Sequence, residues 1–265
     1  MIALKTEREL AVVEENAQLL AEILVEVALR VEPGVTTGEL NRLAERRIRA
    51  AGAEPAFIGR VDLETGRRYP AALCTSVNEE VVHGIPSDRR VLEEGDVISL
   101  DLGLRRAGYY ADAAVTVGVG RISPDAERLV DVARGALQAA IRAATLGNRV
   151  SDLSRAIEEH VHRHGFYVVR EYVGHGIGQQ LWEDPQIPNF FASGGGAVLR
   201  EGMVLCPEPM VKGDDLPVRK LDDGWTVVTA SGSWAAHCEE MVAVTAGGPR
   251  VLTGGIWEAI CRRRT

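Results

Sequence analysis

The chain has 265 residues, of which 46% are hydrophobic and 26% charged, and its formal net charge is -8. It is long enough to bury a sizeable core as one large domain or two small ones, and its composition is that of an ordinary soluble globular protein. Acidic residues outnumber basic ones, and no aromatic residues interleave the arginine clusters, so we expect no nucleic-acid partner.

The N-terminal segment and the cysteines indicate where the protein works. The segment "MIALKTERELAVVEE" is charged throughout and lacks the apolar core of a signal peptide, and no later run is long enough to span a bilayer. We therefore expect a cytoplasmic location and no membrane partner, and we expect a monomer. Cys74, Cys206, Cys238 and Cys261 are scattered without a C-x-x-C pair, which predicts reduced packing residues.

The N-terminal part of the chain predicts two helices. The first begins after a capping box of Thr6 and Glu9 and is expected to be stopped by Gly34. The second begins near Thr36 and ends at Gly52. In the first helix, apolar residues at steps of three and four form one inward stripe, which consists of Leu10, Val13, Ala17, Leu20, Leu24 and Val27. In the second helix, Leu40, Leu43 and Ile48 are expected to face inward.

A second helix pair is predicted in the middle of the chain. Pro124 follows Ser123 at an expected first helical position, and the apolar spacing predicts a helix that runs to Gly147. Another short helix is expected after it. The landmarks of the two pairs are 113 residues apart, since Gly34, Leu40 and Gly52 recur as Gly147, Leu153 and Gly165.

Two predicted strands are repeated as well. "EGDVISLD" and "EGMVLCPE" each contain a Glu-Gly turn, a mostly apolar run and a terminal carboxylate, which makes Asp101 and Glu208 equivalent. The run "DAAVTV" corresponds to "EEMVAV", which makes Asp112 and Glu239 a second equivalent pair.

These repeats predict one duplicated domain. "HGIP" at His83 also echoes "HGIG" at His175, and helices, glycines and acids agree in order. We therefore expect a single α+β domain over residues 1–265, with pseudo-twofold halves at approximately 5–120 and 121–250.

Four carboxylates lie beside the apolar runs of these strands, namely Asp101, Asp112, Glu208 and Glu239. Such positions are expected to be buried, and burying unpaired charges costs several kcal/mol per ion. Separate arginines or helix ends could neutralise each acid. A pair of divalent ions with a bridging hydroxide would satisfy all four together, and we favour this interpretation because the acids are related by an internal repeat.

His175 is the expected nitrogen ligand of this metal site. Gly174, Gly176 and Gly178 surround it and are expected to permit tight turns and the close approach of a ligand. Four carboxylates and one imidazole suit Mn(II), Fe(II) or Co(II) better than a structural zinc. Two such ions would lower the pKa of the water between them and polarise a carbonyl, which predicts a hydrolase.

Five motifs make the sequence resemble the type I methionine aminopeptidases of the pita-bread fold over essentially the whole chain. They are "YPAALCTSVNEEVVHGIP" at residues 69–86, "DLGLRRAGYYAD" at 101–112, "GHGIG" at 174–178, "GMVLCPEPMV" at 202–211 and "GWTVVT" at 224–229. The resemblance implies removal of N-terminal methionine from nascent chains or peptides.

The resemblance also implies roles for individual residues. Two divalent ions (cobalt, manganese or iron, with zinc possible) would be held by Asp101, Asp112, His175, Glu208 and Glu239, with Asp112 and Glu239 as bridges. Glu208 would take part in proton transfer, and His83 would face the substrate near the scissile amide. The methionine side chain would lie among Tyr69, Cys74, Leu181, Met210 and Trp225, whose aromatic, sulfur and aliphatic surfaces suit a thioether.

Trp182 departs from the family pattern. The family has a second histidine here that contacts the substrate's peptide group, whereas an indole can donate one hydrogen bond but cannot accept one or carry a proton. Glu240 also stands where many relatives have histidine, and residues 57–68 diverge beside the pocket. Two alternatives therefore stay open: a specialised paralogue with another peptide or amide substrate, and a pita-bread protein that binds peptide termini without cutting them.

Overall fold

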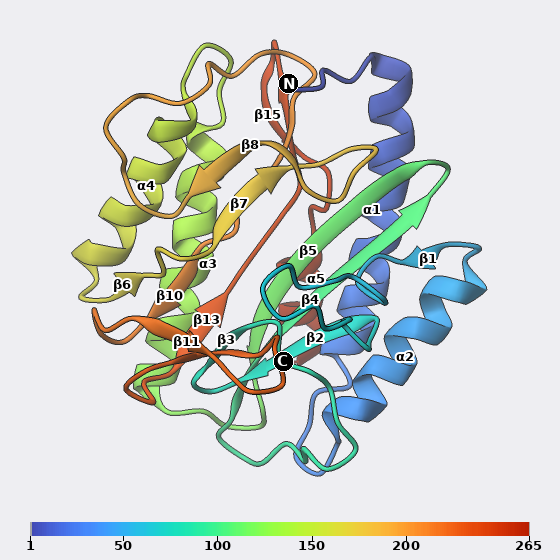
Figure 1. Cartoon of the computed structure of the whole chain (residues 1–265), viewed down its shortest axis with the longest axis vertical. Helices are drawn as coiled ribbons and strands as arrows, with labels where there is room; N and C mark the ends of the chain where they lie inside the picture. Colours follow the sequence, from blue (N-terminus) through green and yellow to red (C-terminus); the bar gives the residue numbers. More distant parts are fainter. Residues whose placement is uncertain (1, 265) are drawn as a thin grey trace.

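The computed structural model describes residues 2–264, so the outermost residues of the predicted 1–265 domain lie outside the described part. Its helices form two pairs and a C-terminal segment (Figure 1). In chain order they are α1 (Glu7–Ala28), α2 (Thr37–Ala50), α3 (Pro124–Ala143), α4 (Val150–Arg163) and α5 (Ile256–Arg264).

The strands pair antiparallel throughout and form four small sheets within the described chain. One contains β1 (Glu54–Pro55), β2 (Leu73–Val77), β4 (Val97–Arg106) and β5 (Tyr109–Gly118). A second contains β3 (Glu80–Val82), β11 (Val218–Lys220) and β12 (Val227–Thr229). A third contains β6 (Tyr167–Val168), β10 (Met210–Lys212) and β13 (Ala235–His237). The fourth contains β7 (Val173–Gly176), β8 (Glu183–Pro188), β9 (Val204–Cys206), β14 (Val242–Thr245) and β15 (Gly248–Val251).

The four paired helices form where the sequence predicts them. Thr6 and Thr36 cap α1 and α2 through complete capping boxes, and Ser123 caps α3 through its side chain. Gly34 takes a φ of 92°, but α1 ends before it at Ala28. Pro33 disfavours a helical backbone at the residue before it, so the helix does not reach the glycine. No helix in residues 2–264 is both long and apolar enough to cross a membrane.

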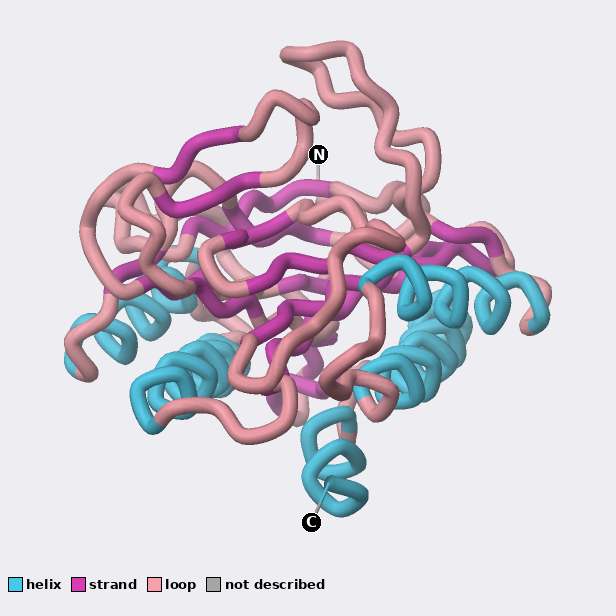
Figure 2. The backbone as a smooth tube through the Cα atoms, turned by 90° about the horizontal axis from the view of Figure 1, so that it is seen from below, coloured by secondary structure: helices cyan, strands magenta, loops and turns pink. Residues whose placement is uncertain are grey.

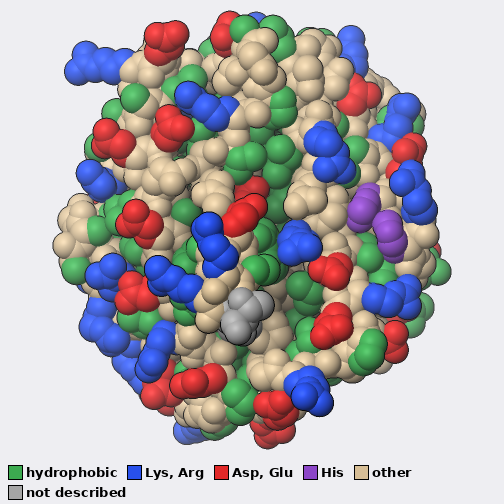
Figure 3. Space-filling model, turned by 180° about the vertical axis from the view of Figure 1, so that it is seen from behind, with side chains coloured by type: hydrophobic (Ala, Val, Ile, Leu, Met, Phe, Trp, Pro, Cys, Tyr) green, Lys and Arg blue, Asp and Glu red, His purple; other side chains and the backbone are tan. Residues whose placement is uncertain are grey.

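The helices cover one side of the strands. Figure 2 shows the two helix pairs and the C-terminal helix below the strand layer, while loops extend from the opposite side. The surface on the C-terminal side carries basic and acidic side chains intermixed (Figure 3). The hydrophobic core is correspondingly divided, with one cluster packed around α1 and α2 and another around α3 and α4.

The predicted strands differ from the structure mainly in length. β4 does not end at Asp101 but continues to Arg106, and it pairs with β5 over ten consecutive positions. In the second half, β9 has only three residues and ends before Glu208, because Pro207 and Pro209 lack the N–H that a ladder requires. The strands of the two halves therefore follow the expected order, but β9 in the second half is shorter and less regular than β4 in the first.

Candidate metal centre

Backbone pairing brings three of the four predicted carboxylates together. Asp101 lies opposite Ala114, and Asp112 lies opposite Gly103, so the two acids are diagonal neighbours on one face of the β4–β5 hairpin. The N–H of Glu239 donates to Ala114 (2.9 Å), and the N–H of Ala114 donates back to Glu239 (3.2 Å). This bridge joins the second half of the chain to the hairpin at the acidic site.

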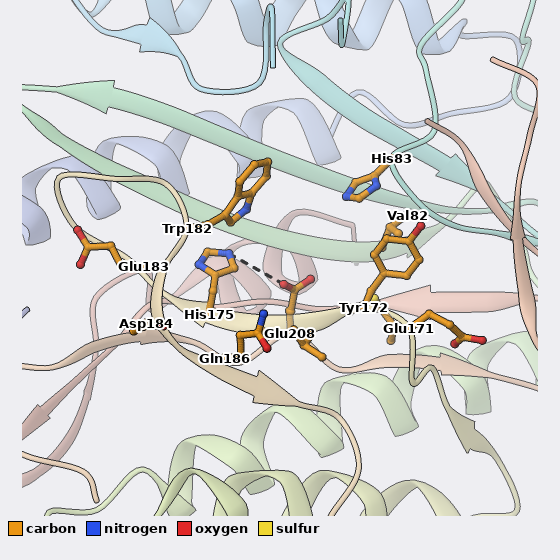
Figure 4. A pocket seen from close by; sticks show the side chains of 13 residues that line it. Val82, His83, Glu171, Tyr172, His175, Trp182, Glu183, Asp184, Gln186 and Glu208 are labelled. Atoms are coloured by element: carbon orange, nitrogen blue, oxygen red, sulfur yellow. Dashed lines mark ion pairs between the residues drawn. The ribbon is translucent and has the colours of Figure 1, made fainter. Parts of the chain in front are cut away.

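His175 and Glu208 complete the cluster. His175 pairs with Cys206 between β7 and β9, and Glu208 follows two residues later. The Nε2 atom of His175 lies 3.9 Å from Asp112 Oδ2, 4.0 Å from Glu208 Oε1 and 3.8 Å from Glu239 Oε1. Figure 4 shows the ring of His175 pointing toward the carboxylate of Glu208.

The hydrogen bond of His175 fixes which nitrogen faces the acids. Its Nδ1 lies 2.9 Å from the carbonyl oxygen of Gly176, which can only accept, so Nδ1 carries the hydrogen. The lone pair of Nε2 therefore points toward the carboxylates. This is the arrangement that metal-binding histidines adopt when a backbone carbonyl orients the ring.

The glycines around His175 serve close packing and do not form the expected tight turns. None of the three has a positive φ. A Cβ atom at Gly174 would collide with the carbonyl oxygen of Cys206, and one at Gly176 would collide with the carbonyl oxygen of Asp184. The glycines thus allow neighbouring chain segments to approach β7 closely on both sides.

The four carboxylates have no cationic side chains beside them. Among residues 2–264, none forms an ion pair with Lys or Arg; the nearest basic nitrogens to Asp112, Glu208 and Glu239 belong to the neutral imidazoles of His175 and His237. One oxygen each of Asp101, Asp112 and Glu239 is buried without a hydrogen-bond partner. Neutralisation by separate arginines, the alternative considered from the sequence, is therefore wrong for this site.

Burial and mutual repulsion shift the pKa values of these acids upward. Burial raises the pKa of Asp101 to about 6. Burial, together with the neighbouring carboxylates, raises the pKa of Asp112, Glu208 and Glu239 well above the ordinary range. Burial lowers the pKa of His175 to about 4, which leaves the neutral imidazole that binds metals.

The donor set fits divalent metal ions. The ligand atoms of Asp101, Asp112 and Glu239 lie within 4.8 Å of one another, and Glu239 also groups with His175 and Cys206. Orphaned carboxylate oxygens and an imidazole nitrogen are the donors that Mn(II), Fe(II) and Co(II) accept. Burial raises the pKa of the Cys206 thiol well above its usual value, so a protonated packing role fits this residue best.

His237 joins this cluster although the sequence analysis missed it. It ends β13, is 1% exposed, and places Nε2 3.1 Å from Glu208 Oε2. The signal was available, because residues two apart in an extended segment face the same side, and Glu239 follows His237 by two. Burial lowers the pKa of His237, so its imidazole is neutral.

Two connected cavities open onto the cluster. The inner one, of about 50 Å³, is lined by all five predicted metal ligands together with Tyr69, Cys74, His83, Trp182 and Trp225. The outer one, of about 410 Å³, also contains Met210. Leu181 lines neither cavity and is fully buried in the core.

Aromatic contacts fix the wall of the inner pocket. The hydroxyl of Tyr69 donates to the carbonyl oxygens of Gly84 (2.9 Å) and Leu73 (3.2 Å), and its ring meets Trp225 edge-on at 5.2 Å. His83 packs edge-on against Trp225 at 5.9 Å. These rings are therefore held in place before any substrate enters.

Trp182 lies at the mouth of the pocket. Its side chain is 54% exposed and borders both cavities, and Figure 4 shows it beside His175, with His83 farther along the same cavity. The guanidinium of Arg60 stacks over the Trp182 ring at 5.3 Å and over the Tyr110 ring at 5.2 Å. The 57–68 loop thus contacts Trp182, the residue for which the sequence predicts a departure from the family pattern.

Comparison with known sequences agrees with this site. The model of the metallopeptidase family M24 matches residues 11–246. The methionine aminopeptidase of Clostridium perfringens is 44% identical over 253 residues, which cover 96% of this chain and 99% of that protein. Methionine aminopeptidase 1 of Bacillus subtilis has the same identity and coverage.

Solved structures share the fold. The methionine aminopeptidase of Thermotoga maritima matches with a TM-score of 0.91 and 42% identity over 96% of this chain and 100% of that chain. The prolidase of Pyrococcus furiosus matches with a TM-score of 0.74 over 95% of this chain and 65% of its own, and at 23% identity it shows the fold alone. The expected α+β pita-bread fold is confirmed.

The predicted resemblance is therefore confirmed over nearly the full length of the chain. A metallopeptidase family implies divalent metal cofactors, and the clustered carboxylates and imidazoles provide the donors for them. By its sequence, its fold and its acidic centre, the chain belongs to the metallopeptidase family M24.

Proposed function

We propose that the protein is a metal-dependent aminopeptidase that removes N-terminal methionine from peptides and nascent proteins. Relatives of this activity align over almost the whole chain. The observation that carries the proposal is that all five predicted ligands face one small pocket beside Tyr69, Cys74 and Trp225. A nascent-chain substrate also supports the predicted cytoplasmic location.

The ligand set is proposed as Asp101, Asp112, His175, Glu208 and Glu239, holding two divalent ions. Cobalt, manganese and iron suit these donors, and zinc is an acceptable substitute. The ions would supply Lewis-acid polarisation of the scissile carbonyl and a nucleophilic water at neutral pH. Glu239 belongs to every candidate ligand group found in residues 2–264, which supports its role as a bridge.

Glu208 is proposed to move the proton. It borders both the inner and the outer cavity, so its carboxyl faces solvent and the path of the substrate backbone. In the metal-free site, burial and the nearby Asp101 raise the pKa of Glu208 well above the ordinary value. A raised pKa favours proton uptake by this carboxyl, which would then pass the proton to the leaving amine nitrogen.

His83 is proposed to bind the substrate's peptide group. It lies at the opening between the two cavities, and contacts with Tyr172 and Trp225 fix its ring. Burial lowers its pKa to about 4, so it acts as a neutral hydrogen-bonding group. Tyr69, Cys74 and Trp225 would enclose the methionine side chain, with Met210 at the rim and Leu181 supporting the wall from the core.

The catalytic unit is proposed as a single domain with duplicated halves at 5–120 and 121–250. Asp101 and Asp112 come from the first half, while His175, Glu208 and Glu239 come from the second. The backbone bridge between Ala114 and Glu239 joins the halves at the site. Neither half alone supplies a complete ligand set, but a single chain contains both halves. We therefore propose that a monomer suffices.

The test is release of free methionine from the peptide Met-Ala-Ser by protein loaded with Mn(II), Fe(II) or Co(II). The proposal predicts release with at least one metal and none after chelation. Failure with every metal would contradict it.

A second candidate is a specialised paralogue that acts on another peptide or amide. The contact of Trp182 with Arg60 favours this candidate, because it places an indole and a guanidinium at the pocket mouth. A library of dipeptides with different first residues distinguishes the two, since the paralogue would release another residue faster than methionine.

A further inference from the structure

His237 has a buried ring nitrogen that the protein does not satisfy. The side chain is 1% exposed, and Nε2 makes no hydrogen bond with the described residues. Buried polar atoms are nearly always partnered in folded proteins, so an orphan nitrogen requires an explanation such as a missing ion. The neighbouring orphans are oxygens of Asp101, Asp112 and Glu239, in the same centre.

The backbone of His237 is held rigidly. The hydroxyl of Thr116 accepts a hydrogen bond from the N–H of His237 (2.9 Å) and donates to its carbonyl oxygen (2.7 Å). Ser99 bonds the same hydroxyl at 2.8 Å, and His237 pairs with Met210 in the ladder. The ring of His237 is therefore positioned by a sheet and not by a loop. Rigid elements of this kind hold a ligand more precisely than loops do.

The distance to Glu208 suits two ligands of one ion. Adjacent ligands with bonds of about 2.1 Å to an octahedral ion lie about 3.0 Å apart. His237 Nε2 lies 3.1 Å from Glu208 Oε2, yet the two atoms do not make a hydrogen bond. Glu208, His237 and Glu239 also form one of the groups whose ligand atoms all lie within 4.8 Å.

We propose that His237 is a further ligand of the metal centre, sharing one divalent ion with Glu208 and Glu239. The centre would then contain two imidazoles, with His175 as the other. This inference rests on the proposed function, because it requires the metal centre. A second nitrogen donor would favour Co(II) and Fe(II) over Mn(II), since imidazole suits the former and carboxylate the latter.

The rival explanation is that His237 only orients Glu208 through a hydrogen bond. Two variants separate the roles. His237→Gln keeps an N–H donor but removes the imidazole, whereas His237→Leu removes both. His83→Gln is the matched control, because His83 is another histidine at the pocket that contains the predicted ligands but belongs to none of the ligand groups in the described chain.

The experiment counts imidazoles in the Co(II)-loaded protein. Proton NMR of the paramagnetic protein is expected to show two strongly shifted, exchangeable imidazole N–H signals in the wild type and one in either His237 variant. His83→Gln is expected to keep both. Calorimetric titration is expected to show Co(II) affinity at least about tenfold weaker in both His237 variants, with a smaller loss for Mn(II).

The outcomes separate this inference from the proposed function. A wild-type protein that binds Co(II) but shows one imidazole signal would overturn only the ligand role of His237. Co(II) binding by His237→Gln that is as tight as in the wild type would also overturn only the ligand role of His237. A wild-type protein that binds no divalent metal would overturn the metal centre and this inference with it. The wild-type spectrum alone decides the question if a variant fails to fold.

Discussion

The two halves of the molecule present their acids in different ways. In the first half, Asp101 and Asp112 lie within a ladder that pairs without interruption over ten positions. In the second half, Glu208 follows the three-residue strand β9, and Glu239 lies between the short strands β13 and β14. The short acids thus lie on regular backbone, and the longer acids lie where the strands are broken.

This difference has a physical reason. A regular hairpin fixes both Cα positions, so a short side chain suffices to place its oxygen. Where the ladder is interrupted, by prolines on both sides of Glu208 and by the gap between β13 and β14 at Glu239, the extra methylene of Glu gives the side chain more reach and freedom. The second half also supplies both imidazoles, His175 and His237, so it determines most of the chemical character of the centre.

The largest effect is expected from replacing Glu239, the acid that the candidate ligand groups share. Glu239→Gln removes a negative charge that belongs to every candidate ligand group in residues 2–264. We expect metal binding to be lost and kcat/KM for Met-Ala-Ser to fall by about 10³-fold or more, since each tenfold corresponds to about 1.4 kcal/mol of lost transition-state stabilisation. Elemental analysis and steady-state kinetics measure both.

Glu240 provides the control for this variant. It is adjacent in sequence but lines a separate cavity with Trp257 and Glu258. Glu240→Gln is expected to bind metal normally and to keep kcat/KM within about threefold of wild type. Equal losses in the two variants would contradict the assignment of Glu239.

The next effect concerns the pocket mouth. Trp182→His introduces an imidazole where the resemblance to the family predicts one, and methionine release is expected to become faster by up to about 100-fold, the effect of one well-placed hydrogen-bond donor. Trp182→Phe is the control, because it keeps an aromatic ring without a hydrogen-bonding group. An unchanged kcat/KM in Trp182→His would show that this departure does not limit the reaction.

The metal-free protein is expected to lose stability as pH rises from 6.5 to 8. The carboxyls have raised pKa values in the fold, about 6 for Asp101, so the folded state holds more protons than the unfolded state. The pKa values of His83 and His175 are lowered to about 4, and that of His237 is lowered as well, so these groups act in the opposite direction, an effect that fades as the pH rises above 6.5. Stability therefore falls with pH in this window.

Thermal unfolding in chelator measures this loss. The melting temperature is expected to fall by about 2–4 °C per pH unit for each extra proton held. Saturating Mn(II) is expected to remove the trend, because the ion binds the deprotonated acids. A metal-free protein that becomes more stable from pH 6.5 to 8 would contradict the description of the site.

The smallest effect is expected at the rim. Arg60→Met removes the charge that stacks on Trp182 and Tyr110 but keeps much of the aliphatic stem. A cation–π contact at an exposed site contributes about 0.5–1 kcal/mol, so KM is expected to rise about two- to fivefold. Arg105→Met, which loses a contact with Tyr110 and a 3.9 Å ion pair with Glu54 but leaves the Trp182 contact intact, should leave KM unchanged, and similar effects in both would contradict a role for the Trp182 contact.

The sequence predicted the features that depend on local patterns. The capping residues Thr6, Thr36 and Ser123 start their helices as expected, because caps and apolar periodicity act within a few residues. The convergence of the acids was also predictable, because an internal repeat relates positions in distant parts of the chain. The proposal that these acids bind metal rests on the same internal repeat.

Features that depend on long-range pairing were not predictable. The reach of β4 beyond Asp101 depends on its register with β5, and the packing role of Gly174 depends on Cys206 in another strand. The two-residue spacing could place His237 beside Glu239, but its proximity to Glu208 depends on the pairing of β10 with β13. The contact of Arg60 with Trp182 likewise joins two loop residues far apart in sequence.

Anomalous X-ray diffraction from crystals of the Mn(II)-loaded protein tests the central claim most directly. We expect anomalous peaks between the carboxylates of Asp101, Asp112, Glu208 and Glu239, at coordination distance from oxygens of both halves. Fully loaded crystals with no peak there, or with manganese bound only elsewhere, would contradict it.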